Sequence, residues 1–73
     1  MTDHTAAAAL ELDYHLRELA EDIEFTELEL DSTTDERERR RLLGVLHDLR
    51  AEYDESLDER NALFEQELAE LTR

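Results

Sequence analysis

The 73-residue chain contains no cysteine, no proline, no lysine and no tryptophan, and its only glycine is Gly44. Without cysteine the chain can form neither a disulfide nor a thiolate metal site. A glycine-rich phosphate loop needs several glycines at fixed spacing, so this class of nucleotide site is excluded as well. With no proline and one glycine, the chain has few helix breakers, which favours long helices.

Long apolar runs are also missing. No stretch approaches the roughly 20 apolar residues that a membrane-spanning helix needs. The short apolar run at residues 6–10 has no basic residue before it, unlike a secretory signal. We therefore expect a cytoplasmic protein that does not bind membranes.

Apolar side chains recur in the first half of the chain at alternating gaps of three and four, as in a helix that packs along another helix. This heptad stripe consists of Ala9, Leu12, Leu16, Leu19, Ile23, Thr26 and Leu30. In the second half the pattern repeats every eleven residues, which favours a different supercoil. That stripe consists of Leu42, Leu46, Leu49, Tyr53, Leu57, Arg60, Phe64, Leu68 and Leu71.

Both stripes require long helices, so the predicted fold class is all-α: a coiled-coil-like antiparallel hairpin of two helices, forming one domain over residues 1–73. We expect the first helix over about 3–30, a turn at 31–34 and the second helix over about 34–72. Thr33 and Glu36 have the spacing of a capping box. Gly44 lies opposite the second stripe, where it is a tolerated interior glycine, a kink or a point of close approach.

A hairpin of this size has a small core. A chain near this length hides only about 60% of the surface that its unfolded form exposes, and oligomerisation is the remedy left to a chain without cysteine. The mismatch between the two periods also disfavours one uniform two-stranded coil. We therefore predict a homodimer or larger homo-oligomer with a helical-bundle core, formed from two or more hairpins.

Charge of one sign dominates, with 22 acidic residues, 8 arginines and a net charge of −14. This charge disfavours direct binding to nucleic acid or to an anionic membrane. Three explanations remain open: solvation of a protein from a salt-adapted or GC-rich host, recognition of a basic protein partner, and mimicry of DNA by carboxylates along a helix.

Opposite charges gather on the two sides of the predicted turn. Acidic residues close the first helix and arginines open the second, which is unfavourable for both helix dipoles. In an antiparallel hairpin the two groups lie side by side, so we predict a cluster of ion pairs across the hairpin. Its predicted members are Glu24, Glu27, Arg37, Arg40 and Arg41. The alternative is an anion-binding patch of arginines.

The residues that could carry chemistry are few. His15 has Glu11 and Glu18 one helical turn away on either side, but the Glu-x-x-His motif of ferritin-like metal sites is missing. Paired carboxylates would need a partly dry pocket to act as acid and base. We expect no enzyme and no cofactor. A metal-binding hairpin assembly is the less favoured alternative.

Arg60 is the one charged residue within the second stripe. Its aliphatic stem can cover apolar surface while the guanidinium reaches water, which is the commoner arrangement. The alternative is an ion pair with Glu11 or Asp13 that fixes the register of the helices.

Four large side chains of the first helix point away from its heptad stripe, given a rotation of about 100° per residue. They are Leu10, Tyr14, Phe25 and Leu28. Because one partner helix cannot cover both sides, we expect these four to bind a second copy or a different protein. The sequence thus predicts a non-catalytic acidic interaction or assembly module. The alternative is an acidic DNA mimic that inhibits a nucleic-acid-binding protein.

Overall fold

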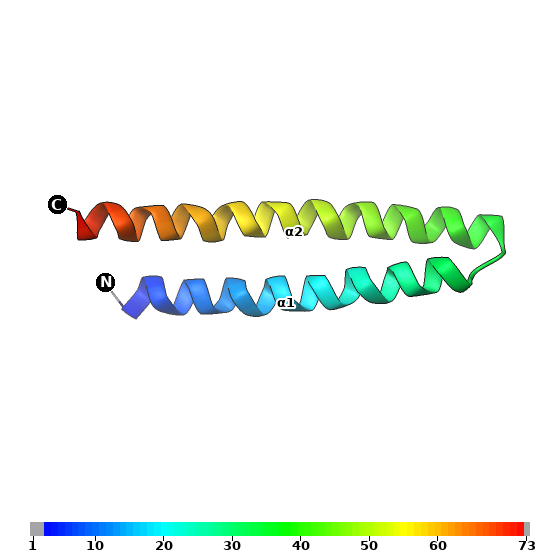
Figure 1. Cartoon of the computed structure of the whole chain (residues 1–73), viewed down its shortest axis with the longest axis horizontal. Helices are drawn as coiled ribbons and strands as arrows, with labels where there is room; N and C mark the ends of the chain where they lie inside the picture. Colours follow the sequence, from blue (N-terminus) through cyan, green and yellow to red (C-terminus); the bar gives the residue numbers. More distant parts are fainter. Residues whose placement is uncertain (1–2, 73) are drawn as a thin grey trace.

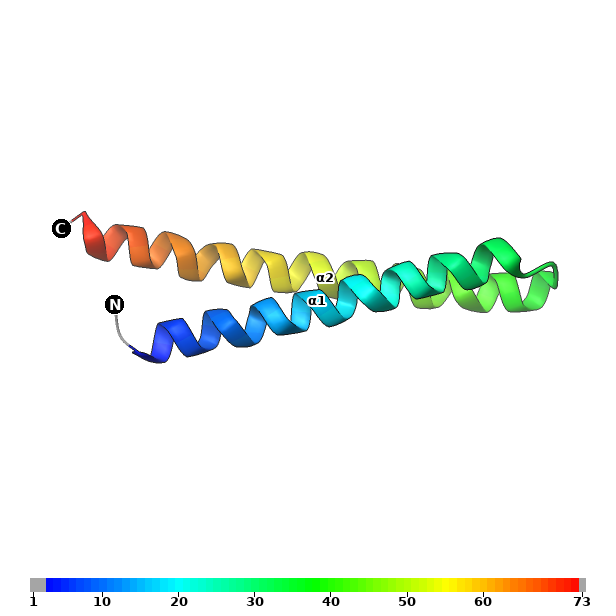
Figure 2. The same ribbon diagram turned by 60° about the horizontal axis from the view of Figure 1, so that its bottom comes forward.

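The computed structural model describes residues 3–72, with side chains from residue 6 onward, as two helices joined by one tight turn. Helix α1 spans Asp3–Ser32 and helix α2 spans Glu36–Leu71. They run antiparallel and side by side in a rod of 57 × 15 × 13 Å (Figure 1 and Figure 2). The predicted all-α fold of two packed helices is confirmed. Helix α2 is the longer one and extends past the start of α1 (Figure 1).

The turn is shorter than predicted and comprises residues 33–35. Asp35 is the N-cap of α2, and its carboxylate accepts a hydrogen bond from the backbone N–H of Arg37 at 3.2 Å. The predicted capping box of Thr33 and Glu36 is wrong. An aspartate at the cap satisfies a free N–H group and places a negative charge at the positive end of the helix dipole, and it does so closer to the first helical residue than Thr33 could.

Helix α1 also ends later than predicted. Ser32 is its last residue, and the Ser32 hydroxyl donates to the carbonyl oxygens of Leu28 and Glu29 at 3.2 and 3.1 Å. Carbonyl groups at the end of a helix have no intrahelical partner, so a hydroxyl can extend the hydrogen-bonded turn by satisfying them.

The core is a single seam between the two helices. Its buried apolar side chains are Leu16 and Leu19 from α1 and Leu42 and Leu46 from α2. Leucine side chains buried to this degree each contribute about 1.5–3 kcal/mol through the hydrophobic effect. Because each helix covers only one side of the other, no second apolar layer forms in the described part of the chain.

Two small polar residues are buried in the same seam. Thr26 is 7% exposed, and its hydroxyl donates to the carbonyl oxygen of Asp22 at 2.7 Å. Ser56 is also 7% exposed. Small polar side chains at these positions add little apolar burial to the seam, in contrast to the four leucines.

The inward-facing positions of α2 keep a heptad spacing to the end of the helix. The row at gaps of four and three consists of Leu42, Leu46, Leu49, Tyr53, Ser56, Arg60, Leu63 and Glu67. The predicted eleven-residue repeat is therefore wrong in the last third of α2. Phe64, Leu68 and Leu71 lie outside the seam and are 57%, 50% and 73% exposed. Since α1 has a heptad stripe, α2 can face it continuously only with the same period.

Gly44 lies on the outer surface of α2. A Cβ atom built at this position would have no neighbour within 4 Å, and no residue in the described chain has a positive φ. Close approach therefore does not explain this glycine, and the interpretation as a tolerated interior glycine agrees with the structure. Neither helix within residues 3–72 has an apolar stretch long enough to cross a membrane.

The open surroundings of Gly44 give a first prediction. Gly44→Ala should raise the free energy of unfolding by about 0.5–1 kcal/mol, because alanine loses less backbone entropy in a helix and meets no neighbour. Urea denaturation followed by circular dichroism measures the difference. A destabilised variant would indicate that this surface is covered in solution.

The single seam gives a second prediction. Leu16→Ala and Leu19→Ala should each lower the free energy of unfolding by about 2 kcal/mol or more, because each opens a cavity in a core of few residues. Tyr14→Gln and Phe25→Gln, whose side chains are 61% and 63% exposed, should each change it by only about 0.5 kcal/mol. If the Tyr14 and Phe25 variants unfold as readily as the leucine variants, both sides of α1 belong to one core.

Candidate interaction surfaces

The four side chains predicted to bind a partner all lie on the outside of α1. Leu10, Tyr14, Phe25 and Leu28 are 59–63% exposed, because the seam takes only the opposite side of the helix. Leu10 and Tyr14 border a shallow hollow that also includes Asp13 and Arg17. These two therefore form one group, and Phe25 and Leu28 lie three or more helical turns further along, toward the hairpin turn.

A second set of apolar side chains lies on α2 at spacings of seven or fourteen residues, so its members share one line along the helix. They are Leu43, Phe64 and Leu71, which are exposed, and Leu57, which is half-buried. Arg50 occupies the remaining position of this line. Leu68, 50% exposed, lies beside it. The sequence pattern did not indicate this line as a surface, because the eleven-residue repeat places most of these residues in the core.

Two ion pairs join the helices on the side of the seam that carries this line. Arg60 pairs with Asp13 through its Nε atom, and the Arg50 guanidinium lies 3.1 Å from the Glu27 carboxylate. The Arg60–Asp13 pair is the alternative arrangement that the sequence left open for Arg60, in which the guanidinium makes an ion pair between the helices. All four side chains are 39–59% exposed, so each pair contributes at most about 1 kcal/mol.

One polar contact joins the helices on the other side of the seam. The Nε2 atom of His15 lies 3.2 Å from a carboxylate oxygen of Glu52. The predicted neighbours of His15, Glu11 and Glu18, lie on its own helix, whereas the observed partner comes from α2. Among the described residues, no three histidine, aspartate or glutamate side chains converge as a metal ion would need.

The arginines near the turn pair differently from the prediction. Arg40 and Arg41 pair within α2, with Glu36 and Glu38. Arg39, which belongs to the same run of arginines at the start of α2, instead reaches across the turn and donates to the carbonyl oxygens of Leu30 and Thr33 at 3.0 and 3.3 Å.

The physical reason for this arrangement is the end of α1. Its last carbonyl groups carry the negative end of the helix dipole, and a guanidinium satisfies them while neutralising that end. Glu27 is the one member of the predicted cluster that pairs across the hairpin, and its partner is Arg50. Glu24 and Arg37 belong to none of the ion pairs found within residues 6–72.

The pair of Glu38 and Arg41 shifts the titration of both groups. The hydrogen bond from the Arg41 guanidinium lowers the pKa of the Glu38 carboxyl, and the same bond raises the pKa of Arg41. A lowered carboxyl pKa contributes stability above the ordinary glutamate range, and that contribution is lost as the pH falls through the lowered value. Because the pair is at the surface, it steadies the first turns of α2 only slightly.

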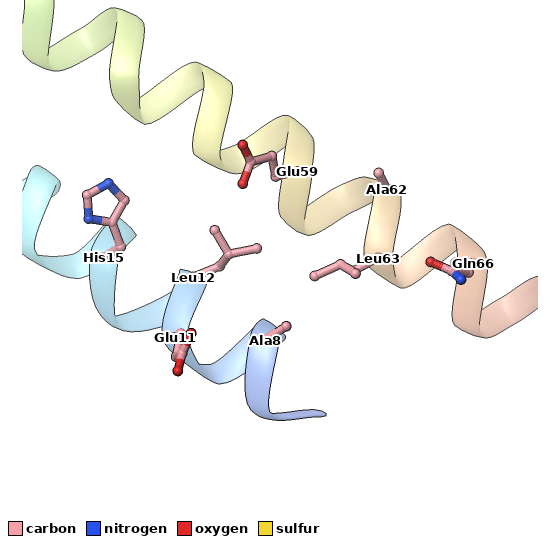
Figure 3. A pocket seen from close by; sticks show the side chains of 8 residues that line it. All are labelled: Ala8, Glu11, Leu12, His15, Glu59, Ala62, Leu63 and Gln66. Carbon is pink, nitrogen blue, oxygen red and sulfur yellow. The ribbon is translucent and has the colours of Figure 1, made fainter. Parts of the chain in front are cut away.

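A groove of about 580 Å³ lies on the His15 side of the seam, near the ends of the helices remote from the turn (Figure 3). Leu12 and Leu63 point toward each other between the two helices (Figure 3). Ala8 and Ala62 leave space around them because their side chains are small, and Glu11 and Glu59 also border the groove. The groove is wide and open, so it cannot exclude water from a reacting group.

The described part of the chain thus presents apolar surfaces and few convergent polar groups. Comparison of the chain with models of known protein families, with curated protein sequences and with solved structures finds no match.

The unbalanced charge gives a third prediction. Residues 1–36 carry twelve acidic side chains and one arginine, Arg17, so the native hairpin concentrates repulsion along α1. Salt at 0.1 M screens such repulsion beyond about 10 Å. The melting temperature should therefore rise between low salt and several hundred millimolar sodium chloride. A melting temperature that falls would show that the surface ion pairs outweigh the repulsion.

Proposed function

We propose that the protein is a non-catalytic interaction module whose hairpin self-associates into a helical bundle. The supporting observation is that the hairpin exposes more surface than a compact protein of the same mass. The hairpin exposes 5970 Å², whereas the scaling of area with mass gives about 4,700 Å² for a compact protein of 8.6 kDa. The excess of roughly 1,300 Å² per chain exceeds the roughly 800 Å² that each partner buries in a standard protein interface.

The exposed side chains are of a kind that also supports self-association. Within residues 6–72, nine large apolar residues are exposed and four leucines are buried. All of the exposed ones except Val45 lie on the outside of α1 or on and beside the line of α2 that contains Phe64, so most of them form patches. Exposed apolar patches of this kind are typical of surfaces that bind other proteins.

The module would serve as an adaptor or as a small subunit of an assembly. Two hairpins stacked on each other give a four-helix core and cover apolar side chains that one hairpin leaves in water. The remaining surface is acidic and would attract a basic protein, with a strength that falls as salt screens the charges. The proposed function includes no catalytic activity.

Self-association gives a fourth prediction. Sedimentation equilibrium over a dilution series in the micromolar range should show reversible conversion of oligomer to monomer. Addition of salt should strengthen the oligomer, because each copy brings a charge of −14. A chain that remains monomeric throughout the series, with an unchanged cooperative thermal transition, would contradict the proposed function.

A further inference from the structure

The contacts between the helices define two sides of the seam. Arg50 contacts Glu27, and residues at seven-residue spacing share a side of a helix, so Leu57, Phe64 and Leu71 lie on the side of that contact. We call this the leucine side. Glu52 contacts His15 and defines the other side, which carries Glu59 and the groove of Figure 3 and which we call the acidic side.

The two sides differ sharply in charge over the half of the hairpin remote from the turn, residues 6–18 of α1 and 52–71 of α2. The acidic side of this half carries five carboxylates and no arginine. They are Glu11, Glu18, Glu52, Glu55 and Glu59. On the leucine side, Asp13 is paired with Arg60, and Arg17 and Glu67 balance each other in number. Asp54, seven residues before Asn61, leaves this side with one net negative charge. A chain with a net charge of −14 thus has one nearly neutral surface.

This nearly neutral surface is also apolar and hollowed. Leu10 from α1 and Phe64 from α2 border a depression of about 270 Å³ that the Asp13–Arg60 pair crosses. Ala6 and Ala9 line the same depression, and their small side chains leave room for a side chain of another molecule. Further along α2, toward its end, Leu68 and Leu71 are also exposed.

We propose that a second copy of this chain docks on the leucine side, face to face and antiparallel, with the two-fold axis passing close to Asn61. The inference rests on the proposed self-association and adds to it the surface and the arrangement. In this arrangement α2 packs on α2 of the other copy, and α1 on α1. Leu57 of one copy then lies near Phe64 of the other, since positions equally far from Asn61 on its two sides face each other.

The distribution of charge favours a second copy of the same chain as the molecule that binds the leucine side. A two-fold interface places residues near the axis against themselves, so any unpaired carboxylate there would repel its equivalent. Every other side of the hairpin presents such carboxylates, whereas Asn61, Phe64 and Leu68 are neutral and Asp13 is already paired. A basic partner would instead be drawn to the acidic side, where its charge would be neutralised.

Asn61 marks the axis because of its chemistry and its place. It is the only asparagine of the chain, and by helical spacing it stands between Leu57 and Phe64 on the leucine side. Its amide both donates and accepts hydrogen bonds, so two such groups related by a two-fold axis can satisfy each other. A single polar residue within an apolar helical interface commonly fixes its register.

The expected interface is modest in size. An overlap centred on Asn61 covers residues 51–71 of each α2, which at 1.5 Å per residue is about 30 Å. With the 15 Å width of the hairpin, each copy contributes about 450 Å² of projected surface, roughly half of what each partner buries in a standard interface. We therefore expect a dimer that dissociates on dilution in the micromolar range. Phe25 and Leu28 stay exposed in it.

The test uses two isosteric substitutions that add the same charge at different places. Asn61→Asp puts a carboxylate beside its own copy and should raise the dissociation constant of the dimer at least about tenfold at moderate salt. Gln66→Glu adds one negative charge on the acidic side and should change it by less than about threefold. Sedimentation measures the constants, and circular dichroism verifies that helicity is unchanged.

Two further comparisons between variants test which surface of the hairpin forms the dimer interface. Phe64→Gln and Leu68→Gln should each weaken the dimer about tenfold or more, whereas Phe25→Gln and Leu28→Gln on the outside of α1 should leave it intact. Since the chain has no cysteine, Asn61→Cys provides a unique thiol near the axis. It should form disulfide-linked dimers under mild oxidation, and Gln66→Cys should not.

The outcomes separate this inference from the proposed function. A wild-type chain that stays monomeric would overturn both. If the wild-type chain dimerises and the Asn61→Asp and Phe64→Gln variants dimerise as tightly as it does, the proposed function stands and the leucine side is not the interface. Cross-linking through Gln66→Cys in place of Asn61→Cys would likewise overturn the inference and place the second copy on the acidic side.

Discussion

The structure depends on one geometric constraint: two helices share a single seam. Each helix can bury only one stripe of side chains against the other, so over residues 6–72 the hairpin has a core of four buried leucines and leaves nine large apolar side chains in water. The antiparallel course and the position of the turn follow from matching heptad rows on α1 and α2. The same geometry leaves the other sides of both helices uncovered, which supports the proposed self-association.

Electrostatics then decides which exposed surface can take which partner. The net charge of −14 opposes contact between copies almost everywhere. The arginines reduce this repulsion at particular places: Arg60 neutralises Asp13 beside the leucine side, and Arg39 satisfies the carbonyl end of α1 at the turn. The hairpin therefore combines one nearly neutral apolar side, on which we propose that a second copy docks, with an acidic side that would attract a basic protein. Neither side resembles an enclosed site for chemistry.

The sequence predicted the two helices, the turn to within two residues and the seam of α1, because a long heptad stripe has few alternatives. It did not predict the end of the α2 seam. Leu63 and Phe64 are adjacent and both apolar, so periodicity alone cannot decide which one faces α1. The partner of Arg60 was likewise open between Glu11 and Asp13, since that choice depends on the register of the helices, and the register depends on a turn whose cap was assigned to Thr33 in place of Asp35. The leucine side can be recognised only when the inward-facing residues at the end of α2 and the partner of Arg60 are known, and the structure provides both.

Small-angle X-ray scattering tests the central claim most directly, because it gives the mass and the length of the particle together. The account predicts a particle of two 8.6-kDa chains at sufficient concentration. Its length should exceed the 57 Å of one hairpin and reach about 85 Å, since copies that overlap over about 30 Å are offset along the rod. A particle with the mass of one chain would contradict the account, because the exposed apolar surface would then be stable in water without a second copy.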